Sequence, residues 1–223
     1  MDARARQGRL MDLGLRDRAV WLLLEDTPVA WAIAETCLEE GANVALIAHQ
    51  VGVDGAARRA ALAAQFGLRL RLASGNQAPL LVGPPPADLL LWAGRPSAII
   101  AFRPERPDRD DETLGGRVGG SCVGSLQPGG ALVLLEANWR GPDEGGDDGA
   151  LPALRQARLQ WQVRAAEGVR VSIIAAPRGV VEPAATGSSG RCGRAVGDLV
   201  AFLAGKGFGS IAVVSEQGAV QLF

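Results

Sequence analysis

The sequence predicts a single α/β domain built on a doubly wound parallel sheet. The chain has 223 residues, and 48% of them are apolar, which suits one sizeable core better than two domains. Short apolar runs alternate along the chain with segments of helical spacing, and this alternation is typical of strands joined by crossover helices. The runs are continuous rather than alternately apolar and polar, which indicates strands buried on both faces of the sheet.

Strands and helices alternate most clearly in the first half of the chain. Gly41 and Gly67 each follow a segment of helical spacing, and a glycine in that place is typical of a helix C-terminus. The expected elements are a strand at 20–24, a helix at 30–40, a strand at 43–48, a helix at 56–66, and strands at 68–73 and 88–92.

The middle of the chain predicts shortened helices. Residues 95–130 contain a charged, proline-bearing stretch and a glycine-rich one, and each glycine inside a helix costs about 1 kcal/mol. Beyond this region the expected elements are a strand at 131–135, an acidic glycine-rich loop at 141–149, a helix at 151–167, a strand at 169–175, a helix at 198–204 and a strand at 211–214.

Composition and charge exclude several classes of function. The formal net charge is -1, with 23 basic and 24 acidic residues, so no overall field attracts nucleic acid. The longest strictly apolar runs, of which residues 19–24 are one, are far shorter than the roughly 20 residues that span a bilayer. Three cysteines without CxxC spacing and a single histidine, His49, provide no constellation for a metal ion. We therefore expect no nucleic-acid, membrane or metal partner.

Residues 1–10 predict a flexible extension ahead of a domain that spans residues 11–223. The extension carries arginines but no apolar segment behind them, and a secretion signal would need one. Translation from Met1 or from Met11 would give the same domain. We expect a cytoplasmic protein with reduced thiols.

Four segments carry a family resemblance. They are MDLGLRDRAVWLLLEDTPVAWAIAETCLEEGANVALIAH at 11–49, DLLLWAG at 88–94, VRVSIIAAPRGVVEP at 169–183 and AFLAG at 201–205. In that order they resemble the opening, the fourth strand, the sixth strand with its turn, and the last helix of short-chain dehydrogenases/reductases. The resemblance covers residues 11–223 with gaps in the middle. It implies a Rossmann-like fold and, in ordinary members, a nicotinamide cofactor.

The glycine fingerprint of that family is degenerate here. The family's glycines let the backbone approach the cofactor pyrophosphate. The corresponding segment has Thr27 in the place of a helix N-cap, followed by a proline that suits the first helical position. Each nearby carboxylate would repel a pyrophosphate oxygen by about 3 kcal/mol at an effective dielectric of 20. We therefore expect no bound cofactor. The degenerate positions are Leu24, Glu25, Asp26, Pro28 and Ala30.

The catalytic residues that the resemblance implies are also missing. The family's serine falls on Ala137 or Asn138, and its tyrosine and lysine fall near Gly146 and Ala150. The chain has no tyrosine at all, so no phenol can pass a proton to or from a carbonyl oxygen. Its only lysine, Lys206, lies far downstream. We expect no catalytic residue in this chain.

The expected helix at 151–167 has two apolar faces. Leu154 and Trp161 belong to one face, and Leu159 and Val163 lie roughly opposite. A helix that lies on a sheet needs one apolar face, so the second suggests a neighbouring subunit. In the resembled family this helix packs across a subunit interface. The apolar end of the chain resembles a tail that pairs between subunits, although docking within the chain is equally allowed, and it adds Leu222 and Phe223 to the expected interface.

The resemblance therefore implies a pseudoenzyme. Its partner would be a catalytic homologue in a heterotetramer, of the kind formed by 2-[hydroxy(phenyl)methyl]succinyl-CoA dehydrogenase in anaerobic toluene degradation. The first alternative is a regulatory protein that senses a ligand without catalysis. The second is an enzyme of another class that uses Glu136 or the acidic residues at 143–148, although an acidic run rich in glycine is more typical of a solvated loop.

Overall fold

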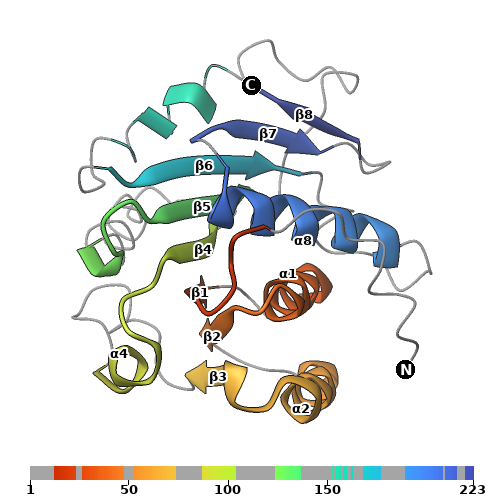
Figure 1. Ribbon diagram of the computed structural model, residues 1–223. Coiled ribbons are helices and arrows are strands. Elements are labelled where there is room, and N and C mark those ends of the chain that lie inside the picture. Colours follow the sequence, from red (N-terminus) through yellow and green to blue (C-terminus); the bar gives the residue numbers. More distant parts are fainter. Residues whose placement is uncertain are drawn as a thin grey trace, which may run out of the picture.

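A parallel sheet runs through the centre of the molecule, and helices cover both of its faces (Figure 1). The computed structural model describes residues 13–23, 27–47, 53–73, 87–103, 124–136, 152, 154–156, 158–159, 162, 168–176, 189–207, 209–214 and 219–223. Within these residues the sheet has eight strands in the order β3-β2-β1-β4-β5-β6-β7-β8. The strands are β1 (Ala19–Leu23), β2 (Asn43–Ile47), β3 (Leu70–Ala73), β4 (Ala98–Arg103), β5 (Ala131–Glu136), β6 (Arg170–Ala175), β7 (Ile211–Val214) and β8 (Val220–Leu222).

The strand order is that of a doubly wound sheet. The chain moves outward from β1 to β2 and β3, returns to β4 on the other side of β1, and continues outward to β7. Strands β1 to β7 are parallel, and β8 pairs antiparallel with β7. In such sheets ligands bind at the carboxyl ends of the strands, where the direction of winding changes. That place lies here between β1 and β4.

The helices form two layers, one on each face of the sheet (Figure 1). On one face α1 and α8 bury their apolar sides in a core that also takes Leu62 of α2. On the other face Leu89 of α4 and Leu154 belong to a second core. Leu154 is part of a helix of which residues 152, 154–156, 158–159 and 162 are described, called the 152–162 helix below. The other helices are α1 (Pro28–Glu39), α2 (Val53–Phe66), the short 3-10 helix η2 (Gly67–Arg69), α4 (Ala87–Ala93) and α8 (Ser189–Gly205).

The central strands are continuous apolar runs because both faces are covered. All five residues of β1 are buried, and Trp21 in its middle is 2% exposed. Residues of β1 that point to one face join the α1 and α8 core, whereas Trp21 and Leu23 join the other core. The predicted parallel sheet with buried strands is confirmed.

Helix α1 has the ends that the sequence predicts. Thr27 is its N-cap, Pro28 is its first residue, and Gly41 follows its end with φ +84. Helix α8 packs closely on α1: a Cβ added to Gly197 would lie 2.7 Å from Thr36 Oγ1. The predicted helix at 198–204 is the second half of α8, which begins earlier, at Ser189.

The predicted strand at 88–92 is wrong, because these residues form helix α4. Four apolar residues in a row, at 89–92, fit a buried strand and a short helix equally well. The fourth strand of the fold is instead Ala98–Arg103, which lies between β1 and β5. The similarity of residues 88–94 to the fourth strand of the resembled family therefore does not extend to their structure.

Two other expectations concern the middle and the beginning of the chain. Helix α4 has seven residues, but it lies ahead of residues 95–130, to which the predicted shortening refers, so it does not test that prediction. Residues 104–123, which make up most of the region expected to lack a regular long helix, lie outside the described residues, as do residues 1–12 with the predicted extension.

Candidate functional site

The carboxyl ends of β1, β4 and β5 form the edge of the sheet at which a site is expected. β1 ends at Leu23, and α1 begins at Pro28. The intervening Leu24, Glu25 and Asp26 lie outside the described residues. Of the degenerate fingerprint, the structure therefore places Pro28 and Ala30, both in the first turn of α1.

The first turn of α1 has few amide groups to offer a ligand. In dinucleotide-binding proteins the unpaired N–H groups of this turn face the pyrophosphate. Here Pro28 has no N–H to donate, and Ala30 N donates to Thr27 Oγ1 at 3.2 Å. Ala30 is also 1% exposed, so its methyl group occupies a packed position where the family has a glycine. The start of α1 therefore does not fit a pyrophosphate held by first-turn amides.

The positions at which the family has its serine, tyrosine and lysine, namely Ala137, Asn138, Gly146 and Ala150, lie outside the described residues. The structure does place the last residue before them, Glu136, which ends β5 at the carboxyl edge and is half-buried. Its backbone oxygen accepts a hydrogen bond from Ala176 N at 3.0 Å. His49, beyond the end of β2, also lies outside the described residues.

The only lysine lies at the opposite edge of the sheet. Lys206 directly follows the end of α8, and a Cβ added to Gly14, ahead of β1, would be 3.1 Å from Lys206 Cε. The carbonyl groups of Ala204 and Gly205 beside it accept hydrogen bonds from Arg170 at the start of β6. A strand of six residues is about 20 Å long. Lys206 is therefore about one strand length away from the edge at which a catalytic lysine would act.

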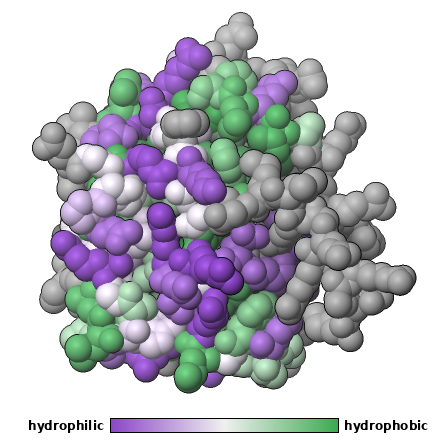
Figure 2. All heavy atoms as spheres, viewed as in Figure 1, coloured by the Kyte–Doolittle hydropathy of each residue, from purple (hydrophilic) through white to green (hydrophobic). Residues whose placement is uncertain are grey.

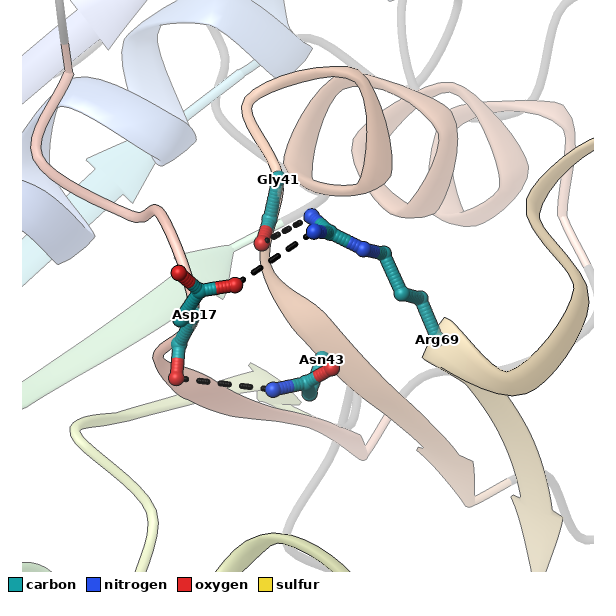
Figure 3. Close-up of polar contacts among 4 residues, drawn as sticks. All are labelled: Asp17, Gly41, Asn43 and Arg69. Atoms are coloured by element: carbon teal, nitrogen blue, oxygen red, sulfur yellow. Dashed lines mark hydrogen bonds and ion pairs between the residues drawn. The ribbon is translucent and has the colours of Figure 1, made fainter.

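A group of polar contacts joins the starts of three strands at this amino edge (Figure 3). Arg69, just before β3, donates from Nη1 to Gly41 O at 2.6 Å and pairs through Nη2 with Asp17 Oδ1 at 3.3 Å. Asn43 Nδ2 donates to Asp17 O at 3.4 Å at the start of β2. Asp17 itself has φ +58, a left-handed conformation that aspartate tolerates better than most residues. The group fixes turns of the scaffold.

Arg170 has a similar role at the end of α8. Its guanidinium donates to the carbonyl oxygens of Ala204 and Gly205, both at 3.3 Å, and to Gly207 O. A positive charge at a helix C-terminus satisfies the free carbonyls and complements the helix dipole. Burial, with a smaller contribution from Arg18, lowers the pKa of Arg170. Arg170 was not among the residues expected at a site, and its partners lie 34 to 37 positions along the chain, where no local pattern indicates them.

The residues expected at a subunit interface separate into buried and exposed ones. Leu154 is 4% exposed and packs in the chain's own core, so it is not available to a partner. Leu159 is 58% exposed on the same helix. Arg158 Nη1 donates to Gly209 O at 3.2 Å and Gln162 Nε2 donates to Val169 O at 2.7 Å, which fixes the helix against the sheet. Trp161 and Val163 lie outside the residues whose side chains are described.

The end of the chain pairs within the molecule. β8 forms an antiparallel ladder with β7, and Phe223 exchanges two backbone hydrogen bonds with Ile211, at 2.8 and 3.2 Å. The sequence left two alternatives for this end of the chain, pairing with another subunit and docking within the chain. The ladder with β7 is docking within the chain. Leu222 and Phe223 nevertheless remain 57% and 50% exposed.

Other kinds of site are not found in the part of the chain that the structure describes. No cluster of three or more histidine, cysteine, aspartate or glutamate residues there could hold a metal ion. None of the described helices has the length and apolarity needed to cross a membrane. Cys37 is a free, buried thiol, and burial, with a smaller effect of Glu40, raises its pKa to about 12. A thiol with that pKa is an inert core residue at neutral pH.

Comparisons with known proteins identify the fold. No family model matches the sequence, and no curated protein matches it significantly. Among solved structures, a short-chain dehydrogenase/reductase of Brucella melitensis, described as a glucose/ribitol dehydrogenase, is 14% identical with a TM-score of 0.61, over 92% of this chain and 98% of that one. The L-sorbose reductase of Gluconobacter frateurii, solved with NADPH and L-sorbose, is 16% identical with a TM-score of 0.58, over 92% and 97% of the two chains.

A third solved structure gives the same result. A short-chain dehydrogenase/reductase of Serratia marcescens is 12% identical with a TM-score of 0.59, over 91% of this chain and 98% of that one. At such low identities the likeness concerns the fold alone. The Rossmann-like fold expected from the sequence is confirmed.

Proposed function

We propose that this chain, which has the fold of the short-chain dehydrogenases/reductases, is a non-catalytic subunit that assembles with a catalytic homologue of the same fold. The catalytic homologue would supply the cofactor site, the tyrosine and the lysine. The chain described here would contribute its surface to the complex, which we propose to be a heterotetramer. Fold alone does not confer activity, so the proposal depends on what the site residues can do.

The observation that carries this proposal is the start of α1. Fewer first-turn N–H groups are available to a ligand there, because Pro28 has none and Ala30 N already donates to Thr27 Oγ1. Two features of the sequence agree with it: there is no tyrosine, and the only lysine lies at the amino edge, beside Gly14. General acid–base catalysis of hydride transfer needs a proton donor near the substrate oxygen. A subunit that lacks the proton-donating tyrosine and lysine would therefore need a second subunit that carries them.

The outer face of the 152–162 helix is the surface that we propose for the catalytic homologue. Leu159 is 58% exposed on that helix, whereas Leu154 faces the core. Arg158 and Gln162 hold the helix in place through backbone oxygens of Gly209 and Val169, so the exposed face is presented in one orientation. A face that is held in one orientation loses little conformational entropy when it docks.

The substrate class that we propose is a hydroxyacyl compound oxidised by the complex with NAD(P). The basis is the resemblance to heteromeric members of the family in which one subunit has lost its catalytic residues. 2-[Hydroxy(phenyl)methyl]succinyl-CoA is the first substrate to assay. The solved relatives include an L-sorbose reductase with NADPH and L-sorbose bound, so the fold accommodates NADPH-dependent chemistry on a hydroxylated substrate in that protein.

Affinity capture of the tagged chain from its own cells tests the proposal. The expected result is a single partner at equal ratio that has the short-chain dehydrogenase/reductase fold and carries its tyrosine and lysine. The captured complex should oxidise a hydroxyacyl substrate, and each subunit alone should not. Recovery of the chain without such a partner would contradict the proposal and would favour a ligand-sensing role.

A matched pair of variants locates the interface. Leu159→Arg should reduce recovery of the catalytic partner at least about tenfold, since a buried apolar contact is replaced by a charge. Leu91→Arg is the control, because Leu91 is 88% exposed on α4, away from the proposed surface. Both variants should keep the melting temperature of the unmodified chain. Equal losses of partner in the two variants would show that the 152–162 helix is not the docking surface.

A further inference from the structure

The amino edge of the sheet carries a row of arginines. Strands β1 to β6 are parallel, so the residues at their starts lie along one edge of the sheet. Arg69 directly precedes β3, Arg16 and Arg18 lie just ahead of β1, Arg95 lies just ahead of β4, and Arg170 is the first residue of β6. These five residues are called the basic row below. The formal net charge of the whole chain is only -1, so the basic row is a local concentration of positive charge.

The turn ahead of β1 presents two members of the basic row. Asp17, between them, is fixed by its N–H, which donates to Gly41 O at 2.9 Å, and by its carboxylate, which pairs with Arg69 (Figure 3). Arg16 and Arg18 are exposed on either side of Asp17, and neither side chain has a hydrogen bond or an ion pair among the described residues. A fixed turn therefore holds two guanidinium groups that are open to a partner.

The carboxylates described at this edge are already engaged. Asp17 pairs with Arg69 at 3.3 Å, and Glu40 accepts a hydrogen bond from a backbone N–H at 3.4 Å. Glu39, at the end of α1, pairs with Arg194 at 2.8 Å. Figure 2 shows hydrophilic surface in the middle of the view, where β1 and β2 lie in Figure 1.

Two further members of the basic row contact backbone oxygens. Arg95 Nη2 donates to Gly124 O at 2.7 Å, and Arg170 donates to the carbonyl groups at the end of α8. A carbonyl oxygen satisfies a donor without neutralising its charge. Burial, and to a smaller extent the charge of Arg18, lowers the pKa of Arg170, so the two guanidinium groups repel each other. An anion at this edge would relieve that repulsion.

The length of the basic row fits an extended polypeptide. Strands β3 and β6 are five positions apart in the strand order, and neighbouring strands are about 4.8 Å apart, so the row is about 24 Å long. An extended chain advances about 3.4 Å per residue, so about seven residues cover this length. A small anion would contact only one or two members of the row.

We propose that the basic row binds an acidic segment of a partner protein, which lies extended along the amino edge of the sheet. Aspartate and glutamate side chains of the segment would accept paired hydrogen bonds from the guanidinium groups, the geometry in which arginine binds carboxylates most strongly. This surface lies opposite the carboxyl edge, at which ligands of such sheets bind. The proposal does not depend on the proposed function.

Titration of the chain with a labelled decaglutamate peptide, followed by fluorescence anisotropy, tests this surface. We expect saturable binding at low ionic strength. The Kd should rise at least about tenfold in about 0.5 M salt, because salt screens exposed charges. A triglutamate peptide should bind at least about tenfold more weakly, since it covers less than half of the basic row. A decaglutamine peptide should not bind.

Two double variants with the same loss of charge locate the binding. Arg16→Gln combined with Arg18→Gln should raise the Kd of decaglutamate at least about tenfold, because two unpaired positive charges are removed. The control combines Arg58→Gln with Arg59→Gln, which removes two exposed arginines from α2 and should change the Kd less than about twofold. Both double variants should keep the melting temperature of the unmodified chain.

Three results would overturn the proposal: no saturable binding of decaglutamate at low ionic strength, equal losses of affinity in the two double variants, or binding of triglutamate as tight as that of decaglutamate. Binding of pyrophosphate without binding of decaglutamate would also overturn it and would indicate a site for a phosphorylated small molecule.

Discussion

At the amino edge of the sheet, several side chains bond to the backbone of neighbouring segments, whereas at the carboxyl edge the side chain of Thr27 bonds within its own helix. Arg69 bonds to Gly41, Ser97 Oγ donates to Ala19 O at 3.0 Å, and Arg170 bonds to the end of α8. At the carboxyl edge Thr27 caps its own helix. Sites in this class of fold form at the carboxyl edge. The polar side chains of Arg69, Ser97, Arg170 and Thr27 therefore stabilise the scaffold.

The largest expected effect lies at the amino edge, where α8 ends against the segment before β1. A Cβ added to Gly205 would lie 1.8 Å from Leu13 O, so Gly205→Ala should cost about 3 kcal/mol or more of unfolding free energy. Gly124→Ala is the control, since no atom lies within 4 Å of the added Cβ. Urea denaturation measures both. Equal stability of the two variants would mean that this contact does not exist in solution.

Arg170→Met should have the next largest effect, about 2 kcal/mol, because the last carbonyls of α8 lose a charged donor. The comparison variant is Arg194→Met. Arg194 pairs with Glu39 at 2.8 Å but its side chain is 50% exposed, and such surface pairs contribute at most about 1 kcal/mol. Chemical denaturation at low and high salt gives both values. A larger loss from Arg194→Met would reverse the ranking of the two contacts.

Thr27→Ala probes the carboxyl edge and should cost about 1 kcal/mol, the usual value of a helix N-cap. Thr27→Ser keeps a hydroxyl that can accept from Ala30 N, and it should be nearly neutral. Thermal unfolding of the two variants distinguishes them. If both were neutral, the hydroxyl would have no capping role and would be available to a ligand.

The interior between the two edges has a smaller, pH-dependent effect. Burial raises the pKa of Cys37 to about 12, above the pKa of this thiol in the unfolded chain. The free energy of unfolding therefore has its full value below the unfolded pKa and falls as pH rises above it. From pH 8 to about 9.5 the free energy of unfolding should fall by about 1 kcal/mol through this thiol. Cys37→Ala should lack this part of the pH dependence. Identical pH profiles would show that the thiol is not buried in solution.

The sequence was sufficient for most of the parallel sheet, because most of the buried strands are continuous or nearly continuous apolar runs and glycines mark the helix ends. It was not sufficient at residues 88–92, where three leucines and a tryptophan fit a helix or a strand. The difference is made by tertiary packing: Leu89 is fully buried against the sheet, whereas Leu91 is 88% exposed. The β-branched Ile99 and Ile100 favour the neighbouring segment as the strand.

The candidate site was predicted in part. The cap at Thr27 and the proline after it follow from local preferences, so the sequence alone was enough to place them. The contacts of Arg69 and Arg170 join residues 28 to 52 positions apart, and no local pattern indicates them. Spacing identified two apolar faces on the 152–162 helix, but only the fold decides that Leu154 faces the core and Leu159 faces outward.

Calorimetric titration of the isolated chain with NADH and NADPH tests the central claim most directly. The L-sorbose reductase, which holds NADPH in its solved structure, is the positive control for the fold. We predict no saturable binding of either cofactor up to near-millimolar concentration, because α1 begins with Pro28 and is capped by Thr27. Micromolar affinity for either cofactor would contradict the account and identify the chain as a dinucleotide-binding protein in its own right.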